Sequence, residues 1–170
     1  MDSTAADLRV HRFLEVEPVV WLSSIRQDGA PHLVPTWFVW DGESILIRSK
    51  PHARKVRNLA HDPRAMVALG DAADDFDVGL LEARAEVTGV GDGASAPAPL
   101  PAAFVAKYGD RIAALGITPA EFAATYSTTI RLTPARALGW HGRSTPRSWL
   151  DAVRRLAFGQ RAAAPALGAA

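Results

Sequence analysis

The sequence contains no cysteine among its 170 residues. Without a thiol, the chain cannot form a disulfide, a cysteine-ligated zinc site, an iron–sulfur cluster or a thiolate nucleophile. It also lacks any run of about 18 uncharged apolar residues, so we expect no transmembrane helix. The N-terminal segment is charged throughout and has no apolar signal-peptide region, so we expect a cytoplasmic protein.

Net charge is almost absent as well. Nineteen Lys and Arg residues oppose eighteen Asp and Glu residues, which leaves a formal charge of +1. This balance excludes a generally basic nucleic-acid binder, so we expect no nucleic-acid partner. The length fits a single domain, which we place at residues 1–141.

Several catalytic motifs are missing. The sequence has no G-x-S-x-G elbow, no H-E-x-x-H metal motif and no G-x-x-x-x-G-K-[ST] phosphate loop. The five histidines lack ligand spacing, so we expect no metal site. No carboxylate pair is placed for acid–base chemistry, and the acidic residues near 71–77 fit a solvated turn. We therefore assign no catalytic side chain.

Alternating apolar residues and Asp-Gly turns predict an antiparallel β-protein. Strands are expected over 19–26, 32–40, 44–49, 64–69, 76–88 and 128–140, about six in all. Asp28-Gly29 and Asp41-Gly42 join the first three of them into a meander. Pro35 lacks an N–H for a strand ladder, which indicates an edge or a bulge. Periodicity alone leaves both a barrel and a sandwich open.

Helices are expected between and around these strands, over 6–15, 50–61, 102–115 and 119–126. Ser49 and Pro51 fit the start of the second helix, and Thr118 with Glu121 fits the start of the fourth. After the domain at residues 1–141, residues 142–160 predict an amphipathic helix rich in arginine, and 161–170 a disordered tail.

A basic cluster stands out at the end of the third strand and along the following helix. It consists of Arg48, Lys50, Arg54, Lys55 and Arg57, with no acid between Glu43 and Asp62. A helix N-terminus adds partial positive charge and free N–H groups, so the segment suits a phosphate or a carboxylate. Asn58 adds amide donors and acceptors. A solvated helix face is the alternative interpretation.

Aromatic residues are dense just upstream, at Trp37, Phe38 and Trp40. Strand alternation places Trp37 on one face and the other two on the opposite face, so a large ring must leave the core or enter an interface. A ligand with a flat ring and a phosphate would use both the aromatic and the basic cluster. Core packing or a dimer interface is the alternative.

Read together, residues 21–69 resemble the split β-barrel flavin and deazaflavin oxidoreductases, the superfamily of pyridoxamine 5′-phosphate oxidase. The resemblance rests on D-G-x-P and P-x-W-F between Asp28 and Phe38 and on K-x-x-N-L at Lys55–Leu59. Further matches occur around Leu81–Ala85 and from Lys107 to Ser127, so it covers about 13–140. The closest branch is that of the coenzyme F420-dependent enzymes.

The resemblance implies a homodimer of mainly β (α+β) split barrels, each with six antiparallel strands and a few peripheral helices. Two cofactor sites would lie at the interface. It places Lys55 and Asn58 at the cofactor phosphate, with Arg54 and Arg57 nearby, and Pro35, Thr36 and Trp37 along the ring. Ser49 would contact the cofactor, and Phe76 would reach the site from the second subunit. These nine are the expected cofactor-binding residues.

The implied activity is hydride transfer between reduced F420 and a small conjugated acceptor, carried out by the cofactor rather than by side chains. An FMN-dependent oxidoreductase of the same fold, or a cofactor- or haem-binding module without turnover, are the alternatives. The sequence departs from the family at His52 and Ala53, where relatives carry Gly, Ser or Thr, and it lacks the C-terminal signature for pyridoxamine phosphate.

Overall fold

The computed structural model describes residues 3–71, 77–89 and 98–140. The elements follow the chain in the order α1 (Ser3–Val16), β1 (Val20–Ile25), β2 (Pro31–Thr36), β3 (Val39–Trp40), β4 (Ile45–Ser49), α2 (Arg54–His61), β5 (Arg64–Asp71), β6 (Asp77–Thr88), α3 (Ala102–Ala114), α4 (Pro119–Thr125) and β7 (Thr128–Trp140). Phe76, the expected helix at 142–160 and the expected tail at 161–170 lie outside the described residues.

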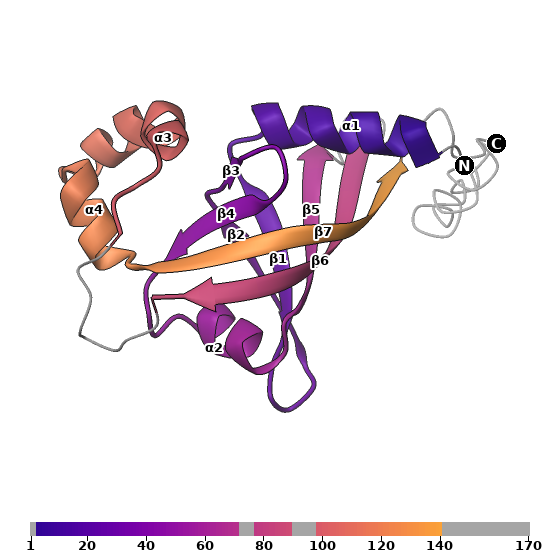
Figure 1. Cartoon of the computed structure of the whole chain (residues 1–170), viewed down its shortest axis with the longest axis horizontal. Helices are drawn as coiled ribbons and strands as arrows, with labels where there is room; N and C mark the ends of the chain where they lie inside the picture. Colours follow the sequence, from indigo (N-terminus) through magenta and orange to yellow (C-terminus); the bar gives the residue numbers. More distant parts are fainter. Residues whose placement is uncertain (1–2, 72–76, 90–97, 141–170) are drawn as a thin grey trace, which may run out of the picture.

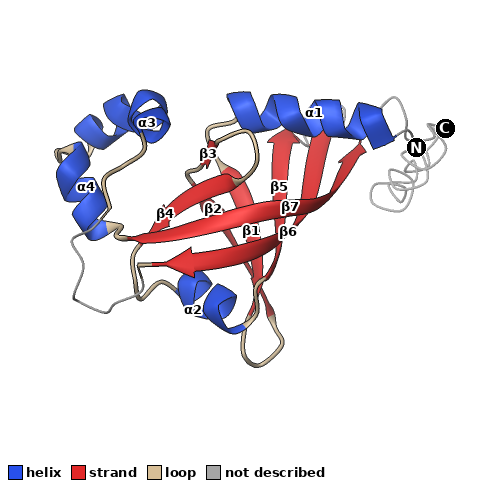
Figure 2. Ribbon diagram, in the orientation of Figure 1, coloured by secondary structure: helices blue, strands red, loops and turns tan. Residues whose placement is uncertain are grey.

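One antiparallel sheet forms the centre of the molecule, in the strand order β2-β1-β5-β6-β7-β4-β3. It has seven strands rather than the expected six, because the expected strand at 32–40 breaks at Trp37 and Phe38 into β2 and β3. β2 is an edge strand, as Pro35 indicated, and Pro35 lies opposite Trp21 of β1. The sheet curls strongly, as expected of a half-barrel (Figures 1 and 2).

The longest pairing joins β6 to β7. Its register shifts by one residue where Glu82 pairs with Arg136 and Ala83 pairs with Pro134. This bulge bends β7 at the proline, which has no N–H for the ladder. The final strand expected at 128–140 is confirmed as one continuous strand with a bend.

Helices cover the two ends of the curled sheet. α1 lies across the ends of β5, β6 and β7, while α2 lies at the opposite end (Figure 1). The core between them is mostly aliphatic, with Val20, Leu22, Ile45 and Ile47 completely buried, and it also contains Phe13 and Phe38. Val56 and Leu59 of α2 belong to this core, so it fixes the helix that carries Arg54, Lys55 and Arg57 of the basic cluster.

α3 and α4 form a separate pair at the left of Figure 1 and have their own aromatic cluster. The expected start of α4 at Thr118 is confirmed, and it forms a capping box: Thr118 Oγ1 accepts from the Glu121 N–H, and the Glu121 carboxylate accepts from the Thr118 N–H. α3 is attached to the sheet by Tyr108, whose hydroxyl accepts from Phe38 N–H at 2.9 Å. The same hydroxyl lies 2.7 Å from Phe38 O and 2.9 Å from Pro18 O.

Candidate functional site

The turn between β1 and β2 forms one wall of the candidate site. Arg26 N–H donates to Ala30 O at 2.9 Å, and Gly29 takes a φ of +81°, which glycine adopts without a side-chain clash. Asp28 Oδ1 accepts from Ala30 N–H at 3.1 Å, and its other oxygen lies 2.5 Å from Arg26 Nη2. The turn therefore presents one guanidinium with its own counter-ion.

The first turns of α2 form the other wall. Val56 and Leu59 are buried and fix the helix to the sheet. Arg54, Arg57 and Asn58 follow one another at spacings of three and one, so they share one side of the helix. Ala53 is the N-cap and offers no side-chain hydrogen bond, which leaves the first N–H groups of α2 without a cap.

These two walls enclose a pocket of about 400 Å³, lined by Arg26, Gln27, Asp28, Arg54, Arg57 and Asn58. Three of these residues carry a guanidinium and one carries a carboxylate. Among the described residues, Arg54 and Arg57 form no ion pair, whereas Arg26 pairs with Asp28. The pocket therefore has a positive excess and suits an anion.

A buried polar chain lies behind the pocket. Asn58 Nδ2 donates to Ser24 Oγ at 3.0 Å, and Ser24 Oγ lies 3.5 Å from His32 Nδ1. Burial lowers the pKa of His32, and the nearby charges of Arg54, Lys55 and Arg26 lower it further. Asn58 thus has a structural role besides lining the pocket, since its amide is held by the sheet.

Two expected contributors to the basic cluster lie elsewhere. Arg48 is buried, and its guanidinium donates to Tyr126 O, Thr129 Oγ1, Ala98 O and Ala123 O at 2.8–3.3 Å. It ties β4 to the α4–β7 connection and is not part of the pocket. Lys50 lies with its Nζ 5.6 Å from the Tyr126 ring centroid.

The expected start of α2 at Ser49 is wrong. The helix begins at Arg54, and Ser49 is a buried residue of β4 whose hydroxyl donates to Lys50 O at 3.4 Å. Because Ser49 pairs in register with Thr128 of β7, its backbone belongs to the sheet and cannot turn into a helix there. Lys55 is half-buried, and burial lowers its pKa, but its side chain does not line the pocket.

The residues expected along a cofactor ring lie at the other end of β2. Pro35 is exposed, and Thr36 is half-buried with its hydroxyl 3.4 Å from Trp37 O. Trp37 stacks on Tyr108 at 4.8 Å and 2°, and on Phe122 at 5.8 Å and 11°. The described structure therefore brings Arg54, Arg57 and Asn58 together, and it places Trp37 with α3 and α4.

Sequence reasoning missed Arg26, Gln27 and Asp28 as pocket residues. The signal was present, because the Asp28-Gly29 turn was recognised, but only the packing of α2 beside β1 shows that the turn faces the helix. The described residues hold no group of three or more His, Cys, Asp or Glu side chains placed to bind a metal. No helix within the described ranges is long and apolar enough to cross a membrane.

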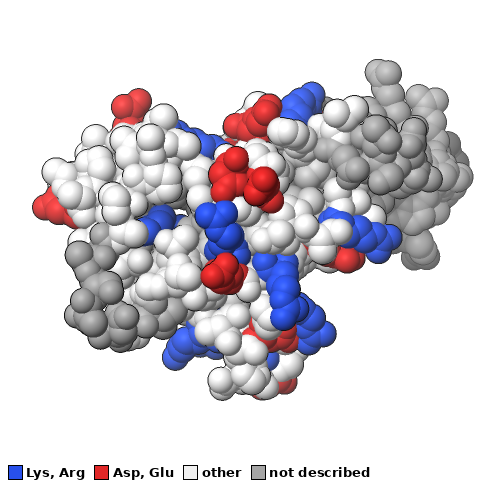
Figure 3. All heavy atoms as spheres, in the orientation of Figure 1, with Lys and Arg blue, Asp and Glu red and all other residues white. Residues whose placement is uncertain are grey.

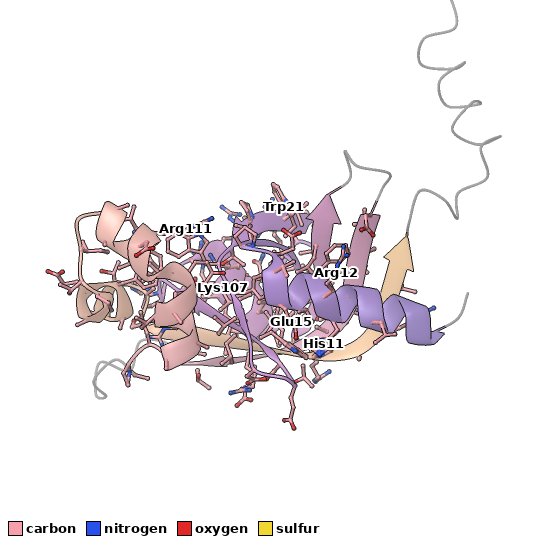
Figure 4. The ribbon with its side chains drawn as sticks, turned by 90° about the horizontal axis from the view of Figure 1, so that it is seen from above. His11, Arg12, Glu15, Trp21, Lys107 and Arg111 are labelled. Carbon is pink, nitrogen blue, oxygen red and sulfur yellow. The ribbon has the colours of Figure 1, made fainter. Side chains whose placement is uncertain are left out.

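Charges are mixed over the rest of the visible surface. Figure 3 shows acidic and basic side chains interleaved on the face that it presents. On the helical side, Lys107 lies on the side of α3 that faces α1 (Figure 4), with its Nζ 3.8 Å from the Phe38 ring centroid. Desolvation lowers the pKa of Lys107, and the charge of Glu17 opposes that shift. This lysine packs on an aromatic ring and serves the attachment of α3.

Comparison with solved structures identifies the fold. An F420 reductase is 22% identical, with a TM-score of 0.59 over 75% of this chain and 94% of that chain. The conserved hypothetical protein Rv2991 from Mycobacterium tuberculosis is 22% identical, with a TM-score of 0.58 over 98% and 93%. The heme storage protein HutZ from Vibrio cholerae is 16% identical, with a TM-score of 0.59 over 81% and 97%. At these identities the likeness establishes a shared fold.

No curated protein matches the sequence. The family profile described as pyridoxamine 5′-phosphate oxidase matches residues 7–141, which includes α1 from residue 7 onward, all seven strands and both pocket walls. The chain therefore belongs to the pyridoxamine 5′-phosphate oxidase family.

Proposed function

We propose that this protein is a cytoplasmic, F420-dependent oxidoreductase that transfers a hydride between reduced deazaflavin and a small conjugated organic acceptor. The observation that carries the proposal is the pocket between the β1–β2 turn and α2, with its three guanidinium groups. A pocket of this charge suits the phosphate of a flavin-type cofactor. The F420 reductase among the similar structures supports the same assignment.

The residues of this pocket fit a phosphate group. Arg54 and Arg57 present guanidiniums that make no ion pair within the described part of the chain, so they are available for charge-assisted hydrogen bonds. The uncapped N–H groups at the start of α2 add donors and a favourable dipole. Lys55, expected at the phosphate, lies outside the pocket lining, but its charge lowers the pKa of His32, as that of Arg54 does. It would therefore add to the attraction of the phosphate through its charge.

When bound, reduced F420 would supply the hydride, and water or a pocket residue would supply the proton that completes reduction of the acceptor. The chain itself needs only to bind, orient and shield the reactants. Arg54 and Arg57 would hold the anionic end, while Asn58, held by Ser24, would keep the pocket wall in place. This division of labour explains why the sequence offers no acid–base pair.

We also propose that the protein acts as a homodimer. Trp21, Leu33 and Met66 are 49%, 58% and 38% exposed, and they lie on neighbouring strands. Leu33 and Met66 both pair in register with Ser23, so with Trp21, two residues along β1, they form one apolar sheet face. Such a face favours a second copy of this chain. Pro35, on the same face, would then line a cofactor ring at the interface.

The dimer is tested by sedimentation of Leu33→Glu. This variant should sediment as a monomer, because a charge would be buried in the proposed interface. Leu115→Glu is the control, since Leu115 is 59% exposed at the end of α3 and away from that face. A monomeric wild-type protein, or a dimer that persists in Leu33→Glu, would contradict this assignment.

The cofactor is tested by fluorescence titration with oxidised F420 and, in parallel, FMN. Arg57→Gln should weaken F420 binding roughly 10- to 100-fold, because a charged hydrogen bond contributes about 1.5–3 kcal/mol. Arg136→Gln is the control. Arg136 is an exposed arginine on β7, so its replacement removes the same charge outside the pocket. Unchanged affinity in Arg57→Gln would refute the phosphate assignment.

Two alternatives have support of their own. FMN shares a ring and a phosphate with F420, so the same pocket would accept it, and tight FMN binding with weak F420 binding would establish it. A haem-binding module without turnover is favoured by the similarity to HutZ. In that case neither reduced F420 nor reduced FMN would be oxidised by any acceptor, and haem would bind instead.

A further inference from the structure

Asp28 is the sole carboxylate among the six residues that line the pocket. Its position is fixed by the turn that carries it. Asp28 Oδ1 accepts from Ala30 N–H, and Gly29 N–H donates to Arg26 O at 2.9 Å. The second carboxylate oxygen lies 2.5 Å from Arg26 Nη2. A negative charge is therefore held at the rim of a pocket that otherwise suits an anion.

This charge has two effects on any anion in the pocket. It neutralises Arg26, which leaves the positive excess to Arg54 and Arg57 on the opposite wall. It also repels the anion directly, and the repulsion is proportional to the charge of the anion. A doubly charged ligand therefore loses twice as much binding free energy to Asp28 as a singly charged one.

We propose that Asp28 is a specificity-determining residue that favours a singly charged phosphodiester over a doubly charged terminal phosphate monoester. The inference rests on the proposed function, because it concerns the same pocket. A phosphate monoester carries a charge of about −1.5 to −2 at neutral pH, whereas a diester carries a single charge. F420 contains a phosphodiester and FMN a terminal monoester, so Asp28 would bias the pocket towards the deazaflavin.

The test compares three ligands that share one ring and differ in charge. These are riboflavin, the methyl ester of FMN and FMN, with no charge, one negative charge and two at pH 7.5. Each is titrated by fluorescence into the full-length wild-type protein and Asp28→Asn. Asparagine keeps an oxygen for the Ala30 N–H and is favoured in hairpin turns, so this variant retains the turn.

The expected gains in Asp28→Asn follow from the ligand charge. Riboflavin affinity should not change, that of the methyl ester should rise about threefold, and that of FMN about tenfold. One charge a few ångströms away in a water-like dielectric has an effect of this size. Glu43→Gln is the matched control, since Glu43 is an exposed acid in the β3–β4 turn and its removal changes the net charge equally. It should alter none of the three affinities.

Equal gains for both esters, or no gain for either, would overturn the role of Asp28. If Asp28→Asn does not fold, Asp28→Ser removes the same charge with another turn-compatible residue. If the wild-type protein binds no flavin and no F420, the proposed function fails, but Asp28 can still be tested. Methyl phosphate and dimethyl phosphate are then titrated by NMR at the Arg57 amide, with the same larger gain expected for the dianion.

Discussion

Replacing Tyr108 by phenylalanine tests how α3 is attached to the barrel. The hydroxyl of Tyr108 lies in the core and contacts three backbone groups: it accepts from Phe38 N–H and lies within hydrogen-bond distance of Phe38 O and Pro18 O. These groups belong to the break between β2 and β3 and to the connection before β1. The Tyr108→Phe change keeps the ring, including its stacking on Trp37, and removes only the hydroxyl.

The magnitude follows from what is left behind. Phe38 is completely buried, so its N–H would lose its acceptor without gaining water. A buried donor without a partner costs about 1–3 kcal/mol, and one further hydrogen bond to a carbonyl contributes about 1 kcal/mol. We therefore expect Tyr108→Phe to lower the free energy of unfolding by about 2–3 kcal/mol. For a chain of this size the Tm should fall by roughly 4–12 °C.

Urea unfolding followed by circular dichroism measures this change directly. Tyr126→Phe is the matched control, because Tyr126 is the second of two tyrosines and its hydroxyl has no hydrogen-bond partner among the described residues. It should cost less than about 0.5 kcal/mol, the usual range of a change without a named mechanism. A Tyr108→Phe variant as stable as Tyr126→Phe would refute the argument that the hydroxyl holds α3 to the β2–β3 break.

Four further predictions concern single residues. Burial raises the pKa of Tyr108 to about 12. The contribution of this group to the free energy of unfolding is therefore fully present below pH 10 and is lost as the pH rises towards 12. Alkaline denaturation of the Tyr126→Phe variant would measure this loss. Arg48→Met should lower the free energy of unfolding in urea by about 3 kcal/mol, because it leaves the carbonyls that Arg48 contacts without a donor. The control variant, Arg54→Met, should lower it by almost nothing. The lowered pKa of His32 means that its neutral form stabilises the fold above about pH 6.5 and that this contribution is lost as the pH falls through the lowered pKa. Saturating phosphate should raise that pKa in an NMR titration, and a constant value would place the anion elsewhere. Trp37→Ala should lower stability by about 2–4 kcal/mol and also weaken F420 binding, whereas a loss of stability alone would restrict Trp37 to packing.

The sequence predicted those elements whose signals are local. The Asp-Gly turns, most of the strands and the helix start at Thr118 agree with the structure, because each depends on a few neighbouring residues, whereas the strand expected at 32–40 breaks at Trp37 and Phe38. The start of α2 was placed too early, because Ser49 is held in β4 by pairing with β7, almost eighty residues further along the chain. The pairing of β4 with β7 outweighs the local preference of Ser49 for a helix start, and the sequence does not show that pairing.

The same limit applies to the candidate site. Arg48 looked like part of the basic cluster, yet the α4–β7 connection surrounds it with carbonyl groups and buries it. Trp37 looked free to contact a ring, yet Tyr108 and Phe122 arrive from distant helices and stack on it. In both cases the residue type was read correctly, and the partner came from a part of the chain that no spacing rule connects to it.

Long-range packing also explains how a nearly neutral chain can hold a strongly positive pocket. Elsewhere, arginines lie close to carboxylates: Arg64 by Asp62, Arg131 by Asp41 and Arg136 by Glu82. At the pocket, α2 brings Arg54 and Arg57 opposite a turn whose single acid is already paired with Arg26. The positive excess of the pocket therefore depends on how α2 packs against the β1–β2 turn.

A change that shifts α2, such as Val56→Ala, should weaken anion binding without removing any charge. Val56 is buried among the sheet residues under the helix, so an anion titration of this variant separates the effect of where the charges lie from the effect of their number. An affinity equal to that of the wild type would mean that charge alone, and not its position, governs the pocket.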